Sequence, residues 1–238
     1  MSSVALETLE PQVDRSRQLA WRIAWTFPLL VLIATSALRY EPAHLWQTAS
    51  GILLLTLVIA AAVTDLRWCR IPNWLTYPAF CWAICINLLS TGLSPEVSSL
   101  FGAVGIADSL AGGCIPFFFM LVIFSMTGGG AGDVKLTAAM GAFLGLSQVI
   151  DAILLSFIFA GGFALIRAVW LLGPWEMVQL LYRRVGSWVL PLWIQPPSKE
   201  QAAFMRQPMP LGPSFALGTA LVLFDVNVQY FVEKLNIQ

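Results

Sequence analysis

The sequence predicts an all-α fold, a polytopic bundle of about seven transmembrane helices. Of the 238 residues, 58% are hydrophobic and only 11% are charged, whereas a soluble domain carries about a quarter charged residues. The charged residues also cluster, so that none lies between Glu41 and Asp65 or between Arg70 and Glu96. A helix crosses the roughly 30 Å hydrocarbon layer with about 20 apolar residues, and most of the uncharged gaps are long enough.

Seven apolar segments are expected to be helical. In chain order they cover about 21–39, 46–65, 74–91, 99–126, 133–148, 151–172 and 211–231. The fourth contains Gly102, Gly105, Gly112 and Gly113, and small residues of this kind let helix backbones approach closely in a membrane bundle. The fifth is short and runs almost directly into the sixth.

These segments divide the chain into four parts. Residues 1–45 hold a tail and an extra helix, 46–172 form a core, 173–210 form a cytoplasmic insertion, and 211–238 hold the last helix and a short tail. The insertion is rich in Trp and Leu, contains an Arg-Arg pair and ends in a Pro-rich stretch. This composition predicts an amphipathic segment on the membrane surface followed by a linker.

The Lys and Arg residues predict the orientation, because cytoplasmic loops carry an excess of them. With the amino terminus in the cytoplasm, only Arg39 and Lys234 fall outside. Asp65, at the end of the second span, and Asp133, at the start of the fifth, then share the cytoplasmic end of the bundle. Ionisable side chains in spanning helices are costly and usually face a bundle interior or a watery cavity, which favours a functional role for this pair.

The remaining aspartates of the apolar segments belong to the outer half. For Asp108, Asp151 and Asp225 we favour helix ends and interfacial solvation over a functional role.

Two carboxyl groups in a partly dry site do not both ionise at low cost, so one proton is shared between them. The ionised group can take a proton from water while its partner donates one to the carbonyl oxygen of a peptide bond. The glycines of GGGAG before Asp133 fit such a site, because glycine lets the chain leave helical order near the membrane interface. A flexible turn also explains these glycines, but it does not explain a second aspartate at equal depth.

Other classes of function fit the sequence poorly. The formal net charge is zero, so no basic patch predicts nucleic-acid binding. The four cysteines form no CxxC pair and there is one histidine, so we expect no metal, no disulfide framework and no cofactor. A phosphate-binding loop is excluded because Asp133 and Val134 separate the last glycine from Lys135.

Three segments resemble motifs of the type IV prepilin peptidases, an aspartic family of the GxGD type. TDLRWCRIPNWLT (64–76) resembles the first-aspartate motif, GAGDVKL (130–136) the second, and MPLGPSFALG (209–218) the Pro-x-Gly-Pro segment that opens the last helix. The resemblance implies that Asp65 and Asp133 are the catalytic pair. It further implies that eight motif residues contact substrate or support the site: Gly130, Gly132, Lys135, Arg67, Arg70, Asn73, Gly212 and Pro213.

The resemblance also implies an activity and a location. Such enzymes are multi-pass proteins of the bacterial inner membrane, and their active site faces the cytoplasm. They cut the leader peptide from membrane-inserted type IV prepilins, Flp-type pilins or pseudopilins, typically just after a glycine. Bifunctional members carry paired CxxC motifs in a domain that methylates the new amino terminus; this sequence has no such motif, so no N-methylation is expected.

Two alternatives remain open. An ion- or proton-coupled transporter would use the same two aspartates as ion ligands, although no repeat between two halves of the chain is visible. A catalytically silent assembly factor would keep the fold and both aspartates without the reaction.

Overall fold

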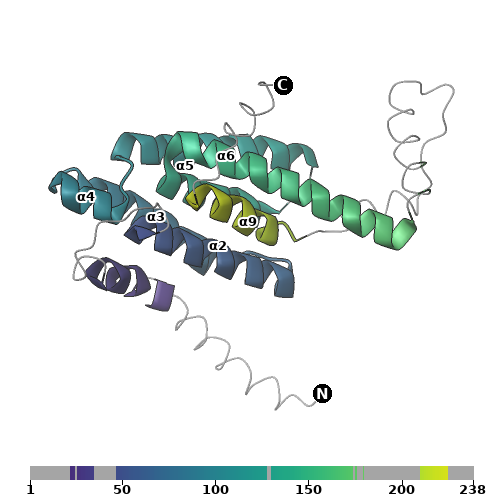
Figure 1. Cartoon of the computed structure of the whole chain (residues 1–238), viewed down its shortest axis with the longest axis horizontal. Coiled ribbons are helices and arrows are strands. Elements are labelled where there is room, and N and C mark those ends of the chain that lie inside the picture. Colours follow the sequence, from purple (N-terminus) through teal and green to yellow (C-terminus); the bar gives the residue numbers. More distant parts are fainter. Residues whose placement is uncertain are drawn as a thin grey trace, which may run out of the picture.

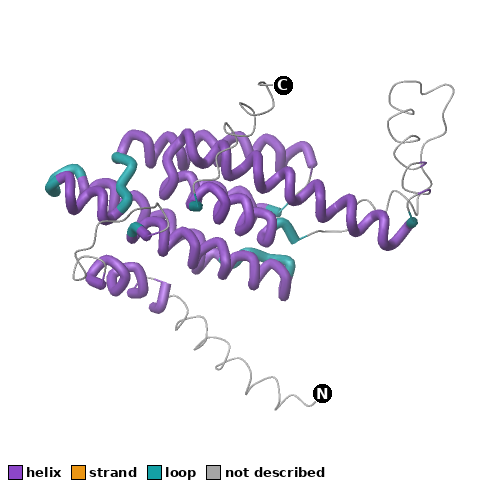
Figure 2. The backbone as a smooth tube through the Cα atoms, viewed as in Figure 1, coloured by secondary structure: helices purple, strands orange, loops and turns teal. Residues whose placement is uncertain are grey.

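The computed structural model describes residues 22–24, 26–34, 47–127, 130–173, 175, 179 and 210–224. Figure 2 shows helices joined by short loops, and no strand occurs among the described residues. The helices are α2 (Ala49–Trp68), α3 (Asn73–Ser90), α4 (Pro95–Phe101), α5 (Ile106–Thr127), α6 (Ala131–Leu172) and α9 (Gly212–Leu223). Residues 26–34 are helical as well. The predicted all-α fold is confirmed.

The helices pack into one bundle around α6. In Figure 1, α9 lies between α2 and α6, and it contacts both; α5 and α3 also pack against α6. Leu54, Val58, Leu136 and Met140 form part of the core, and each exposes at most 1% of its surface. In a lipid environment such a core is held by close packing rather than by removal of apolar surface from water.

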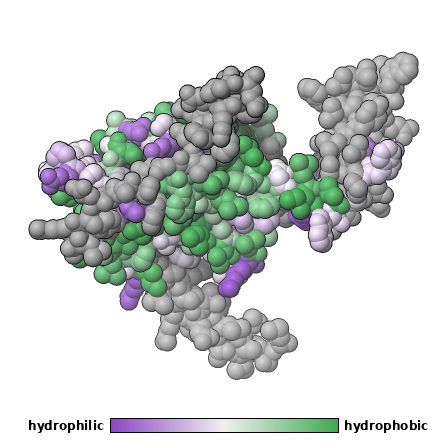
Figure 3. All heavy atoms as spheres, in the orientation of Figure 1, coloured by the Kyte–Doolittle hydropathy of each residue, from purple (hydrophilic) through white to green (hydrophobic). Residues whose placement is uncertain are grey.

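The outer surface of the bundle is largely apolar. Apolar side chains cover much of the described face in Figure 3, and Phe118, Val122 and Ile158 are among the exposed ones on α5 and α6. Three segments are long and apolar enough to cross a membrane, namely Ala49–Trp68, Pro95–Met126, which contains α4 and α5, and Ala131–Arg167. These features are those of a multi-pass membrane protein, and the count of seven spans stays a prediction.

The expectation of one continuous helix over 99–126 is wrong. The short helix α4 ends at Gly102, which has φ 65°, and Gly105, with φ 93°, precedes α5. Glycine adopts positive φ without the steric cost that a Cβ brings, so these two glycines interrupt the helix. Gly112 does have the expected packing role, because a Cβ on it would overlap the backbone of Gly141 in α6.

The expected fifth and sixth spans, 133–148 and 151–172, form the single element α6 with a break inside it. Gly145 has φ 76° and ψ 176°, so the break lies at this glycine and not at 149–150. The expected last span, 211–231, begins as α9, and its residues after 224 lie outside the described part. The insertion 173–210 also lies outside it, except for 173, 175, 179 and 210.

Candidate active site

Asp65 lies in the last turn of α2 and exposes only 6% of its surface. The helix continues past the expected end at 65 and is closed by Cys69, which has φ 49° and donates its N–H to the Asp65 carbonyl oxygen at 2.8 Å. This left-handed C-cap satisfies one of the terminal carbonyls of α2. Asp65 is therefore carried by a complete helical turn and not by a loop.

The start of α9 contacts Asp65 directly. The Gly212 N–H donates a hydrogen bond of 2.8 Å to Asp65 Oδ2, and Pro213 follows in the first turn of the helix. The first N–H groups of a helix have no intrahelical partner and carry partial positive charge, so they suit a carboxylate. A Cβ on Gly212 would lie 2.8 Å from Asp65 Cβ and 3.1 Å from Ala61 O. The third motif therefore lies against the first aspartate and holds one of its oxygens.

Replacing Gly212 with alanine is expected to push α9 away from α2 and to lengthen its hydrogen bond to Asp65. The added methyl group should cost about 1–3 kcal/mol of stability, as overpacking commonly does, measured by thermal unfolding in detergent. As a matched control, Leu217→Ala removes an exposed side chain of α9 and should change stability by less than about 0.5 kcal/mol. A Gly212→Ala variant as stable as the wild type would contradict the close contact.

Asp133 lies in the first turn of α6 and is half-buried. Gly130 precedes the helix in an extended conformation, and its carbonyl accepts the Asp133 N–H at 3.1 Å. The carboxyl groups of Asp65 and Asp133 lie close enough for an electrostatic interaction. The ends of α2 and α6 thus bring the two aspartates together, as the distribution of Lys and Arg in the sequence predicts.

The two glycines of the second motif lie against this pair. A Cβ on Gly130 would lie 3.0 Å from Asp133 Oδ2, and one on Gly132 would lie 3.0 Å from Ile71 Cβ. Ile71 belongs to the loop that follows α2. Gly132 therefore lets the start of α6 approach the segment that leads away from Asp65.

Lys135 connects the second motif to the first. Its Nζ donates a hydrogen bond of 2.9 Å to Asn73 Oδ1, at the start of α3, and lies 5.1 Å from the centre of the Tyr77 ring. Cation–π contacts occur at this distance. The sequence motifs predict Lys135 and Asn73 as site residues but not Tyr77, although Tyr77 lies one helical turn after Asn73 on the same face of α3.

The remaining predicted residues, Arg67 and Arg70, follow Asp65 in the chain. Arg67 and Arg70 are exposed, at the end of α2 and in the loop after it. Within the described residues their side chains form no ion pair or hydrogen bond. Trp68 lies between them and is 64% exposed, and Trp with Arg is typical of a membrane–water interface.

The other aspartates are not part of this arrangement. The Asp108 Oδ1 accepts the Leu146 N–H at 3.1 Å, and Leu146 lies about 20 Å along α6 from Asp133 at 1.5 Å per residue. Asp151 lies further along the same helix, and Asp225 is outside the described residues. In the part of the chain that the structure describes, no three His, Cys, Asp or Glu side chains group together as metal ligands would.

Comparison with known proteins shows what this part of the chain is similar to. The model of the type IV leader peptidase family matches residues 52–165, which include Asp65 and Asp133. Over 215 residues, 88% of this chain, 28% of positions are identical in the prepilin leader peptidase/N-methyltransferase of Burkholderia pseudomallei. The chain is thus similar to the type IV leader peptidase family in the part that carries both aspartates.

Other relatives of this leader peptidase family carry the same description. The Neisseria gonorrhoeae protein is 30% identical over 131 residues, or 54% of this chain, and the Klebsiella pneumoniae protein is 30% identical over 150 residues, or 60%. The chain covers 44% and 62% of these two relatives and 58% of the Burkholderia protein. It thus spans about half the length of the curated relatives that it matches. No solved structure gives a match of similar significance.

Proposed function

We propose that this chain is a membrane-embedded aspartic endopeptidase that removes the leader peptide from type IV prepilins, Flp-type pilins or pseudopilins. The observation that carries the proposal is that the end of α2, with Asp65, and the start of α6, with Asp133, lie near each other at one end of an apolar helical bundle. Residues 46–172 and the last helix form the catalytic core.

The reaction needs one proton shared between the two carboxyl groups. One carboxylate deprotonates a water molecule, which attacks the scissile carbonyl carbon, and the other carboxyl donates its proton to the carbonyl oxygen. When the tetrahedral intermediate collapses and the C–N bond breaks, the carboxyl that took the proton from water gives it to the leaving nitrogen. The other carboxylate takes a proton from a hydroxyl group of the intermediate, so the pair again shares one proton. The Gly212 N–H donates a hydrogen bond to Asp65 Oδ2, which leaves the other carboxyl oxygen available for the reaction.

The surroundings of the pair support a cytoplasmic site in the inner membrane. Arg67, Arg70 and Lys135 all lie near the two aspartates along the chain, and cytoplasmic ends of membrane helices carry such residues. A prepilin inserted in the same bilayer would present its leader at this side. We limit the proposal to leader removal, without N-methylation, because the four cysteines form no CxxC pair.

The direct test is cleavage of precursors by the purified protein in detergent. Type IV prepilins, Flp-type pilins and pseudopilins are incubated with it, and mass spectrometry of the products identifies the new amino terminus. We expect loss of the leader from at least one class, with the product otherwise unmodified.

The result that opposes the proposal is a folded protein that cleaves none of the three classes. Proton-coupled solute uptake by the protein in liposomes, without cleavage, would favour the transporter alternative in its place. A methylated product from the purified chain with S-adenosylmethionine would overturn the limit to leader removal.

A further inference from the structure

The helix that carries Asp133 is interrupted at Gly145. With φ 76° and ψ 176°, this residue lies in a region that L-amino acids rarely adopt. The break separates residues 131–144, which begin with the aspartate motif, from residues 146–172. The direction of the first segment therefore depends on what holds the chain at residue 145.

Polar side chains from two other helices hold the break. Asp108 Oδ1, from the first turn of α5, accepts the N–H of Leu146, the first residue after the break, at 3.1 Å. On the other side of Gly145, the carbonyl oxygen of Ala142 accepts the Ser109 hydroxyl at 2.7 Å and Asn87 Nδ2 at 3.4 Å. Backbone groups at helix ends need such partners because their intrahelical partners are missing. We call Asp108, Ser109 and Asn87 the polar clamp.

Asn87 ties the polar clamp to the loop before α5. This side chain is fully buried in α3, and its Oδ1 accepts the N–H groups of Val104 and Gly105 at 2.9 and 3.0 Å. A fully satisfied buried amide of this kind fixes the relative placement of the segments that it joins. Loop, α3, α5 and α6 are thereby fixed to one another at the break.

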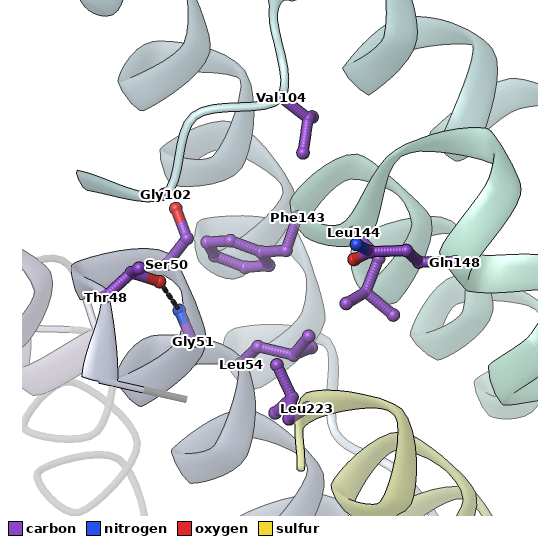
Figure 4. Close-up of a pocket in the computed structure, with 10 residues that line it drawn as sticks. All are labelled: Thr48, Ser50, Gly51, Leu54, Gly102, Val104, Phe143, Leu144, Gln148 and Leu223. Atoms are coloured by element: carbon purple, nitrogen blue, oxygen red, sulfur yellow. Dashed lines mark hydrogen bonds between the residues drawn. The ribbon is translucent and has the colours of Figure 1, made fainter. Parts of the chain in front are cut away.

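The break also faces α2, α9 and the loop before α5. A cavity of about 20 Å³ lies there, and Figure 4 shows Phe143, Leu144 and Gln148 of α6 around it, with Ser50 of α2 and Leu223 of α9. A space of this size holds about one water molecule. The side chains around this cavity leave room next to the break, whereas the polar clamp is hydrogen-bonded to the backbone on both sides of it.

Small rotations of the first segment of α6 move Asp133 by distances that matter for catalysis. The close contact between Gly141 and Gly112 lies about 12 Å along the helix from Asp133, at 1.5 Å per residue, and would be the pivot of such a rotation. A rotation of roughly 5° about this pivot displaces Asp133 by about 1 Å, and a misplacement of 1 Å can lower a rate by about 10²-fold.

We propose that the polar clamp, with Asp108 at its exposed end, positions Asp133 against Asp65 by fixing the direction of residues 131–144. The expected effect on cleavage rests on the proposed function. The placement of the helix does not, because it can be measured without any cleavage assay. Asp108 is a positioning residue in this scheme and does not touch the substrate.

The kinetic test compares two substitutions at one position. Asp108→Ala removes the acceptor for Leu146, and kcat for leader cleavage is expected to fall roughly 10- to 100-fold with little change in KM. Asp108→Asn keeps an oxygen at the same place and should restore kcat to within a few-fold of the wild type. Asp151→Ala is the control. Asp151 lies in α6 and forms no hydrogen bond at the break, so this variant should cleave at the wild-type rate.

The structural test does not require activity. The four cysteines are first replaced by serine, and spin labels are placed on the exposed positions 68 and 131, at the end of α2 and the start of α6. Pulsed electron paramagnetic resonance then measures the distance between the two labels. In Asp108→Ala the distance distribution should shift or broaden, and in Asp108→Asn it should match the parent. If Asp108→Ala fails to fold, Ser109→Ala removes a single bond to Ala142 and should act in the same direction, less strongly.

An unchanged distance distribution in the Ala variant, with or without a change in kcat, would overturn the positioning role. Equal losses of kcat in the Ala and Asn variants would also overturn it, because the Asn side chain keeps the acceptor. If the parent protein cleaves no prepilin, the proposed function fails, while the distance measurement still decides whether the polar clamp places α6.

Discussion

Replacing Asp65 or Asp133 with asparagine is expected to slow leader cleavage by roughly 10²- to 10⁴-fold, the range that general acid–base catalysis contributes. Asparagine has nearly the size of aspartate, but its amide neither takes a proton from water nor supplies one to the carbonyl oxygen. Because the two carboxyl groups act as a unit, the double variant should be no slower than the slower of the single variants. Cleavage by excess enzyme, followed by mass spectrometry, measures the chemical step.

The matched control for this experiment is Asp151→Asn. Asp151 lies in the same helix as Asp133 and is likewise half-buried, but it is on the far side of the break at Gly145. The Asp151→Asn variant should cleave prepilin at the wild-type rate, and thermal unfolding should show that all variants are folded. Wild-type cleavage by either single variant of the pair would end the proposal of an aspartic mechanism.

The grouping of the two aspartates could be predicted because it depends on long-range features of the sequence. The apolar segments predict how many times the chain crosses the membrane, and the Lys and Arg residues predict which helix ends share a side. This reasoning places Asp65 and Asp133 at one end, where the structure has them. Their catalytic role stays a prediction until the substitutions are made.

The contacts that support the pair could not be predicted in the same way. The hydrogen bond from Gly212 to Asp65 joins residues far apart in the chain, and it depends on where the start of α9 lies relative to the end of α2. Periodicity gives the face of a helix but not its position along its neighbour. The contact of Lys135 with Tyr77 depends likewise on how α3 and α6 meet.

The structural roles of the glycines are also difficult to predict from the sequence. Gly102, Gly105 and Gly145 have positive φ and end or interrupt helices, whereas Gly112 and Gly141 are helical and touch each other. Both groups need the absence of a Cβ, one for the backbone conformation and one for space. The sequence alone does not separate the two needs, so the breaks were expected at the wrong places.

Gly141→Ala is expected to destabilise the protein by about 3 kcal/mol or more, the upper end of the usual cost of overpacking. A Cβ on Gly141 would fall on the carbonyl oxygen of Gly112, and one on Gly112 would fall on the Gly141 carbonyl oxygen in return. The obstacle is backbone on both sides, so no side-chain rotation relieves it, and α5 and α6 must move apart. Thermal unfolding in detergent measures the loss.

Gly161→Ala is the matched control, because Gly161 lies in the same helix and a Cβ there would meet no atom within 4 Å. Alanine has a higher helix propensity than glycine, by about 0.8–1.0 kcal/mol in water, so this variant should be as stable as the wild type or more so. Equal stability of the two variants would show that α5 and α6 do not approach backbone to backbone. If the two helices do approach backbone to backbone, Gly141→Ala should also lower leader cleavage at temperatures where the protein stays folded, because Asp133 moves with the first segment of α6. Gly161→Ala should leave cleavage unchanged.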